Sequence, residues 1–238
     1  MAEAQKDVPK RYARILALGN APPTRTKLTA AGRVTLAAPE GARPPNVVGV
    51  ESSPGETKGI SMSLGQLTEP FAFPAAGNLK LNKGEQVGSD VWKQVPSPKS
   101  AFSTLMMWRP EGVNHWDKSK AVFIDDSTKS FPAGTIRFIN LTDLPVKILL
   151  NGKKLELGPG KFLAEKVNVG DNTLEMGYVG KTRNVNLRSD RFKLAKGDRV
   201  NAIVWRSDIK EARQAANLFF NIEKAQNYQP KKPKKGRS

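Results

Sequence analysis

The single histidine of the chain lies beside a tryptophan and an aspartate, in the order His115, Trp116, Asp117. A His next to a carboxylate can act as a general base when a nucleophile lies within hydrogen-bond reach. The alternative is an imidazole that packs on the neighbouring indole. The sequence contains no Gly-x-Ser-x-Gly nucleophile motif. We therefore predict no catalytic residue and no enzyme, and keep His115 and Trp116 as candidate ligand or partner contacts.

Metal-binding chemistry has few candidate ligands in this chain. There is no Cys and one His, so thiolate or multi-imidazole sites for zinc or copper are excluded. Oxygen ligands remain, and Asp125 with Asp126 forms one adjacent carboxylate pair that could hold calcium. The alternative for this pair is a solvated turn between two strands. We predict no metal and no cofactor.

Charge is the strongest signal in the composition. The net charge is +17, and residues 127–238 carry +13 of it, from 23 Lys and Arg against 10 Asp and Glu. A strongly basic surface attracts polyanions such as nucleic acid, anionic polysaccharide or an anionic membrane surface. Such a contact is electrostatic and weakens with salt. We predict an anionic polymer or protein as the partner and leave the oligomeric state open.

Two segments concentrate the positive charge. Residues 181–199 include Phe192, whose ring could stack on bases if it is exposed. The alternative is that Phe192 faces the core while the charges are solvated. The second segment is the C-terminal tail, which acts as an electrostatic tether or as a solubilising end. The predicted polyanion-binding residues are Lys181, Arg183, Arg188, Arg191, Lys193, Lys196, Arg199, Lys231, Lys232, Lys234, Lys235 and Arg237.

Short apolar runs at period two, separated by turn residues, predict an all-β chain. The 17 Pro and 20 Gly punctuate these runs. The pattern predicts antiparallel β-sandwiches of immunoglobulin-like general architecture. One segment departs from it: residues 208–216 carry helix formers, with Asp208 as N-cap and Glu211 three residues later, and predict one short helix near the C-terminus. No internal repeat at a fixed period is visible.

The polar break at residues 125–129 is the expected domain boundary. We divide the chain into a flexible N-terminus (1–12), an N-terminal β region (13–126), a C-terminal β-sandwich (131–225) and a disordered basic tail (226–238). The pattern leaves open whether the two β regions share one core. No apolar run approaches the roughly 18 residues that span a bilayer, so no transmembrane segment is predicted.

The clearest local prediction is a hairpin over residues 146–157. Apolar residues alternate there with Lys and Glu on both sides of Asn151-Gly152. The Asn-Gly pair tolerates the positive φ that a type I′ turn needs at both central positions. Each position serves the sheet, so we expect this stretch to be scaffold.

The segment FPAGTIRFINLTDLPVKILLNGKKLELGPGK, residues 131–161, is similar to a recurring segment in an uncharacterised family of small, usually exported bacterial β-sandwich proteins. RILALGNAPP, residues 14–23, resembles the strand-turn opening of that family. The resemblance implies a β-sandwich and a place in the bacterial periplasm or cell envelope if a signal peptide was removed, and otherwise in the cytoplasm. It implies no activity and no functional residues.

The sequence thus predicts a non-enzymatic structural or interaction protein that contacts an anionic partner through its basic C-terminal half. One alternative is a nucleic-acid-associated protein that uses the 181–199 face and the tail, which requires Phe192 or Trp116 on the surface. Another is an envelope carbohydrate binder or hydrolase with a site near His115, which requires a concave site there.

Overall fold

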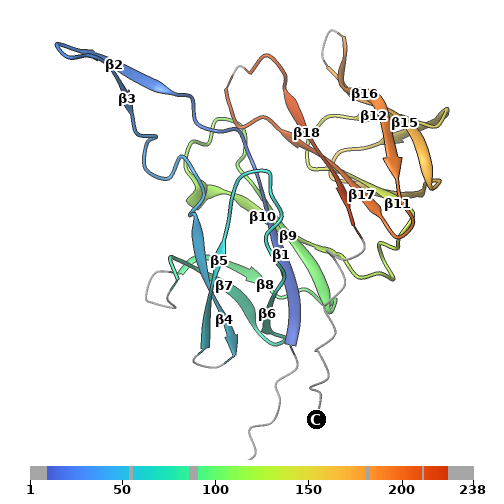
Figure 1. Ribbon diagram of the computed structural model, residues 1–238, viewed down its shortest axis with the longest axis horizontal. Coiled ribbons are helices and arrows are strands. Elements are labelled where there is room, and N and C mark those ends of the chain that lie inside the picture. The colour runs from blue at the N-terminus through green and yellow to red at the C-terminus, as the bar shows by residue number, and fades with distance from the viewer. Residues whose placement is uncertain (1–9, 54–55, 86–90, 181–182, 211, 225–238) are drawn as a thin grey trace, which may run out of the picture. The chain divides into compact units, whose positions relative to one another are not determined.

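The computed structural model describes residues 10–53, 56–85, 91–180, 183–210 and 212–224. These residues form 18 strands and one short 3-10 helix, which confirms the predicted all-β class (Figure 1). The chain divides into two compact units: Met1–Ser127 with Ser207–Glu211, and Thr128–Arg206 with Ala212–Ser238. Each unit has its own cluster of buried apolar side chains, so there are two cores rather than one.

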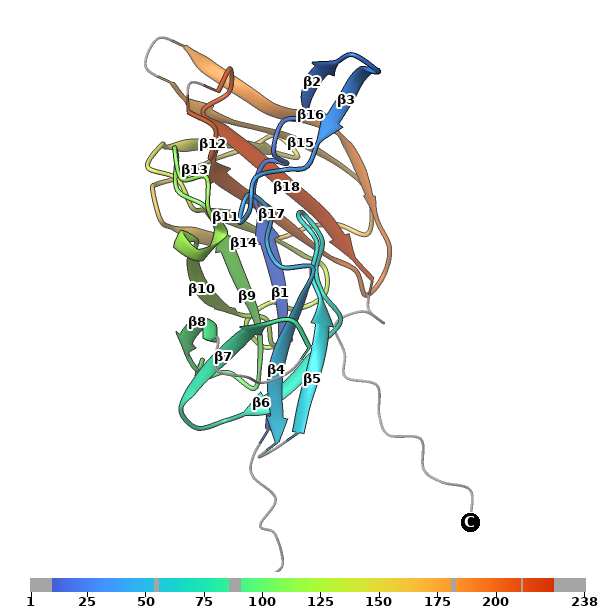
Figure 2. The same cartoon turned by 90° about the vertical axis from the view of Figure 1, so that its left-hand side faces the viewer.

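Unit 1 contains two four-stranded sheets and a separate hairpin. Its mixed sheet has the order β10-β9-β1-β6, with β1 parallel to β9, and Figure 2 shows these two strands side by side. Its antiparallel sheet has the order β5-β4-β7-β8. The elements are β1 (Lys10–Leu18), β2 (Arg25–Thr29), β3 (Gly32–Leu36), β4 (Val47–Ser53), β5 (Glu56–Ser61), β6 (Phe71–Pro74), β7 (Asn78–Lys83), β8 (Val91–Pro96), β9 (Phe102–Trp108), the 3-10 helix η1 (Trp116–Lys118) and β10 (Lys120–Asp125).

Unit 2 contains two four-stranded sheets. The mixed sheet has the order β14-β11-β17-β18, with β11 parallel to β17, and the antiparallel sheet has the order β13-β12-β15-β16. The strands are β11 (Thr135–Asn140), β12 (Val146–Leu150), β13 (Lys153–Leu157), β14 (Phe162–Lys166), β15 (Gly170–Val179), β16 (Asn184–Leu194), β17 (Arg199–Arg206) and β18 (Ala216–Glu223).

The two units share one topology. When the β2–β3 hairpin is set aside, the strands of unit 1 pass through its two sheets in the same order as the strands of unit 2. In both units the first strand pairs in parallel with the strand before the last. The chain therefore contains a structural repeat that no fixed period in the sequence revealed. The β2–β3 hairpin is an insertion in unit 1, at the connection that residues 141–145 make in unit 2.

Burial follows the position of each strand in its sheet. The interior strands β9 (FSTLMMW) and β17 (RVNAIVWR) are buried on both faces except at their last residue, which explains their near-continuous apolar runs. The hairpin β12–β13 alternates instead, and its turn has positive φ at both Asn151 and Gly152. The predicted hairpin over residues 146–157 is confirmed.

The helix predicted over residues 208–216 is wrong. The described part of this segment consists of bends and a turn, and β18 begins at Ala216. Asp208 caps no helix, because its carboxylate accepts hydrogen bonds from Asn20 and Arg109. A buried tertiary interaction thus overrides local helix propensity.

Candidate functional site

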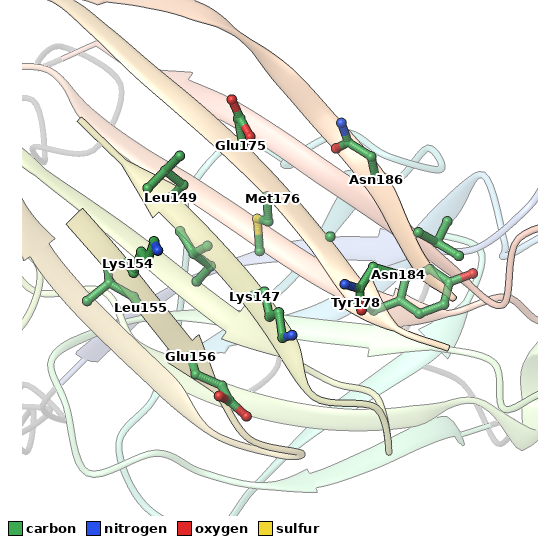
Figure 3. Close-up of a pocket in the computed structure, with 13 residues that line it drawn as sticks. Lys147, Leu149, Lys154, Leu155, Glu156, Glu175, Met176, Tyr178, Asn184 and Asn186 are labelled. Carbon is green, nitrogen blue, oxygen red and sulfur yellow. The ribbon is translucent and has the colours of Figure 1, made fainter. Parts of the chain in front are cut away.

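The outer face of the antiparallel sheet in unit 2 carries a groove of about 700 Å³ (Figure 3). Strands β12, β13, β15 and β16 line it. The inner face of the same sheet packs on the core of unit 2. The solvent-facing side chains around the groove include Lys147, Leu149, Lys154, Glu156, Glu175 and Asn186.

A β-bulge with a glycine lies on β15 in the lining of the groove. The register of β15 against β16 shifts between Met176 and Gly177, which marks a β-bulge. A Cβ atom on Gly177 would lie 2.3 Å from the carbonyl oxygen of Val185, so a larger residue does not fit unless β16 moves. Gly177 thus adds no side chain between its cross-strand neighbours, Lys147 on β12 and Asn186 on β16.

The groove offers polar groups of both signs around apolar side chains that include Leu149. Lys147 lies opposite Glu156 on β13, and Leu149 lies between Lys154 and Glu175. The polar side chains of the lining are those of Lys, Glu, Asn and Tyr residues. The arrangement offers charged and hydrogen-bonding partners to a polar molecule.

The two predicted contact residues next to Asp117 have different surroundings. Trp116 is fully buried in the core of unit 1, so its prediction as a surface contact is wrong. Its backbone N–H donates to the carbonyl oxygen of Gly41, and the guanidinium of Arg109 lies 5.5 Å from the ring centroid. His115 is 41% exposed, and its Nδ1 lies 3.2 Å from Oδ2 of Asp117.

Asp117 gathers hydrogen-bond donors from two strands of the antiparallel sheet in unit 1. Nε1 of Trp92 donates to Oδ1 at 2.7 Å, and Nζ of Lys83 donates to Oδ2 at 3.4 Å. Desolvation by burial raises the pKa of Asp117, but these hydrogen bonds and the charge of Lys83 outweigh it, so that the pKa lies below its ordinary value. The cluster therefore joins η1 to β7 and β8, which is a structural role.

We expect Trp92→Phe to raise the pKa of Asp117 toward its ordinary value, because Phe keeps the ring but removes the N–H donor. A lowered folded-state pKa means that Asp117 contributes stability above the unfolded pKa of about 3.9, and that this contribution is lost as the pH falls through the folded pKa. A carboxyl ¹³C NMR titration in the acid range measures the shift. An unchanged Asp117 pKa in the variant contradicts the assigned cause.

The structure divides the predicted basic segment at residues 181–199. Four of its cations are exposed: Arg183, Arg191, Lys193 and Lys196. Lys181 lies outside the described residues, as do the tail residues Lys231, Lys232, Lys234, Lys235 and Arg237. Arg191 and Lys193 alternate with the buried Phe192 and Leu194, so they share the outer face of β16.

The other two cations of this segment contact protein groups. Arg188 is half-buried, with its guanidinium 3.7 Å from the ring centroid of Phe220. Arg199 has no exposed surface, and its Nε donates to Glu223 at 2.9 Å, so its prediction as a polyanion contact is wrong. Phe192 packs edge-to-face on Phe220 with 5.4 Å between centroids. The hypothesis that bases stack on Phe192 is therefore wrong as well, and the alternative that Phe192 faces the core is the one observed.

Unit 1 buries an ion pair that sequence patterns did not predict. Arg14 on β1 forms an ion pair with Asp126, and the hydroxyl of Thr104 donates to the same carboxylate at 2.9 Å. Asp126 is 1% exposed, so it lies neither in a solvated turn nor at an open calcium site. Asp125 accepts a hydrogen bond from the backbone N–H of Ser127.

Unit 2 has a corresponding network at the corresponding positions. Nε of Arg137 donates to the side chain of Asn201 at 2.9 Å, and the amide of Asn201 donates to Glu223 at 3.1 Å. The parallel registers match Arg137 with Asn201, as they match Arg14 with Thr104 in unit 1. Both mixed sheets therefore hold an arginine on their first strand and a buried carboxylate at or just after the end of their last strand.

Arg109 is the most connected buried side chain of unit 1 that sequence analysis missed. Its Nε donates to Asp208 at 2.7 Å, and its other nitrogens donate to the carbonyl oxygens of Ala42, Asn114 and Asn20 at 3.1–3.2 Å. It thus ties together three loops and the segment after β17. Asp208 is buried too and also accepts from the amide of Asn20 at 2.8 Å.

Within the described ranges, no group of three or more His, Asp and Glu side chains is placed to hold a metal ion. No helix in the same ranges has the length and apolar character to cross a membrane. The chain matches no model of a known protein family and no curated protein.

Proposed function

We propose that this protein is a non-enzymatic interaction module, built from two β-sandwich units of immunoglobulin-like architecture, that binds an anionic polymer through unit 2. The polymer lies across the outer face of the antiparallel sheet, where Lys147 and Lys154 border the groove and Arg191 and Lys193 extend the cationic surface along β16. The resemblance of residues 131–161 to small, usually exported bacterial proteins agrees with a polymer of the cell envelope.

The observation that carries this proposal is the excess of cations at the surface of unit 2. Its described residues include 16 Lys and Arg and eight Asp and Glu. Two cations and two acids are buried, namely Arg137, Arg199, Asp198 and Glu223. Fourteen cations and six acids therefore remain at the surface, and this charge attracts an anionic partner.

The chemistry of the outer face selects among anionic polymers. Glu156 and Glu175 lie beside the groove cations and repel a chain that carries a charge at every repeat. A polymer with neutral polar groups between its charges, such as an acidic polysaccharide, meets the carboxylates and Asn186 with its hydroxyls. Because Phe192 is buried, its ring does not offer a stacking surface for unpaired bases on this face.

We expect Arg191→Ala/Lys193→Ala to weaken binding of the full chain to hyaluronan, an acidic polysaccharide in which neutral sugars alternate with charged ones, by about tenfold at low salt, because two polymer charges lose their counter-charges. Isothermal titration at several salt concentrations gives the affinity and its salt slope. The matched control Lys58→Ala/Lys80→Ala removes two exposed cations from unit 1. Equal losses in both variants would mean that only the net charge matters, and would overturn the proposed face.

A further inference from the structure

The β2–β3 hairpin, residues 25–36 and here called the arm, is an exposed element of unit 1 whose side chains suggest a binding partner. It is inserted where unit 2 has the short connection of residues 141–145, so the shared fold does not require it. In Figures 1 and 2 the arm stands apart from both four-stranded sheets of unit 1. All residues of its strands except Gly32 are exposed.

The arm exposes several large apolar side chains, which do not stabilise a hairpin that is surrounded by water. Leu28 is 79% exposed, Val34 47% and Leu36 38%. They are three of the eight large apolar side chains that are exposed in the described chain. An isolated two-stranded hairpin is only marginally stable in water. A surface that covers these side chains would stabilise the arm by burying them.

Every charge on the arm is positive. Arg25, Lys27 and Arg33 are its charged residues, and no Asp or Glu occurs in residues 21–39. The register sets a cation opposite each exposed apolar side chain: Arg33 opposite Leu28, Lys27 opposite Val34, and Arg25 opposite Leu36. Consecutive cross-strand pairs point to opposite faces of a ribbon, so both faces carry cations as well as apolar groups.

We propose that the arm docks end-on into an anionic lipid surface. Leu28 and Val34 lie two and three residues from the turn, which places them within about 10 Å of the tip at roughly 3.3 Å per residue. Interfacial elements bury their apolar groups to a depth of about 5–10 Å. Lys27 and Arg33 lie at the same depth and extend their charged ends back to the headgroups.

Other occupants fit the arm less well. A flat protein surface would cover one face of the ribbon and leave the cations and apolar groups of the other face in water. A second copy of this chain carries the same charge of +17 and repels it. Nucleic acid supplies the negative charge but little apolar surface, and residues 24–37 contain no aromatic ring for base stacking. An anionic membrane supplies both components around the whole tip.

A fluorophore on the arm tests the depth of insertion directly. The chain has no Cys, so Leu28→Cys gives one labelling site for an environment-sensitive dye on the full chain. We expect its emission to shift to the blue with vesicles of phosphatidylcholine and phosphatidylserine, and to stay unchanged with phosphatidylcholine alone. The control is Val169→Cys in unit 2, at a side chain that is 63% exposed. An equal shift at both positions, or no shift at Leu28→Cys, overturns the proposal.

Unlabelled variants then separate the two components of the interaction in a vesicle sedimentation assay. We expect Lys27→Ala/Arg33→Ala to lower partitioning onto anionic vesicles at least about tenfold, and Leu28→Ser to lower it about tenfold. Lys58→Ala/Lys80→Ala controls for net charge, and hyaluronan binding should survive in both arm variants because it belongs to unit 2. If the arm variants instead lose binding to duplex DNA and keep vesicle binding, the occupant is nucleic acid and the proposal is wrong.

Discussion

Arg109→Ala is expected to lower the free energy of unfolding by about 3–5 kcal/mol, because it leaves the buried carboxylate of Asp208 without its charge partner. The side chains of Arg109 and Asp208 are 7% and 0% exposed, so water cannot replace the lost hydrogen bonds without opening the structure. The variant also frees the carbonyl oxygens of Asn20, Ala42 and Asn114. Urea denaturation followed by tryptophan fluorescence measures the change.

The structural repeat supplies a matched control for this prediction. Arg206 follows Trp205 at the end of β17, as Arg109 follows Trp108 at the end of β9. Its guanidinium lies 3.6 Å from Asp143, whose side chain is 75% exposed. A pair of this kind contributes about 0–1 kcal/mol, so Arg206→Ala should change stability little. Similar losses in the two variants would show that burial of the ion pair is not the cause.

Sequence patterns predicted those parts of the fold that are encoded locally. The hairpin of β12 and β13 could be found because its alternation has period two and its Asn-Gly turn needs no distant partner. Strands β9 and β17 could be found as apolar runs, since strands in the middle of a sheet are buried on both faces. In the same way, the alternation of Arg191, Phe192, Lys193 and Leu194 favours the inward direction that Phe192 takes.

The errors concern side chains whose direction is set by distant parts of the chain. Trp116 follows a polar loop and looks exposed, but its backbone N–H bonds to the distant Gly41 and its ring lies in the core. Arg199 lies within a basic run and looks solvated, but it is buried together with Glu223 on the neighbouring strand, to which it donates a hydrogen bond. A charged residue is normally predicted to lie at the surface, so local sequence patterns do not reveal buried ion pairs.

The repeat escaped detection because an insertion removes any constant spacing. Residues 105–109 (LMMWR) and 202–206 (AIVWR) end equivalent strands, and Arg14 and Arg137 occupy equivalent positions on the first strands. The arm is inserted in unit 1 between Arg14 and the segment 105–109. The sequence separation from Arg14 to Arg137 is therefore larger than the separation between the two Trp-Arg pairs. What survives in both units is the parallel strand pair and its buried arginine, which indicates that this network holds the first strand to the end of the fold.

Glu223→Ala tests that role, and we expect it to lower the free energy of unfolding by about 3–5 kcal/mol. Glu223 is 2% exposed and accepts hydrogen bonds from both Arg199 and Asn201, so its removal leaves a buried guanidinium next to Phe131 without this carboxylate. The control Glu165→Ala deletes a carboxylate of the same unit whose partner Lys153 is 59% exposed, and should cost about 0–1 kcal/mol. Denaturation curves of the two variants give the comparison. If Glu223→Ala costs no more than Glu165→Ala, the buried network does not fasten β18 to β17, and the resemblance between the two units at this position is one of geometry without a shared energetic role.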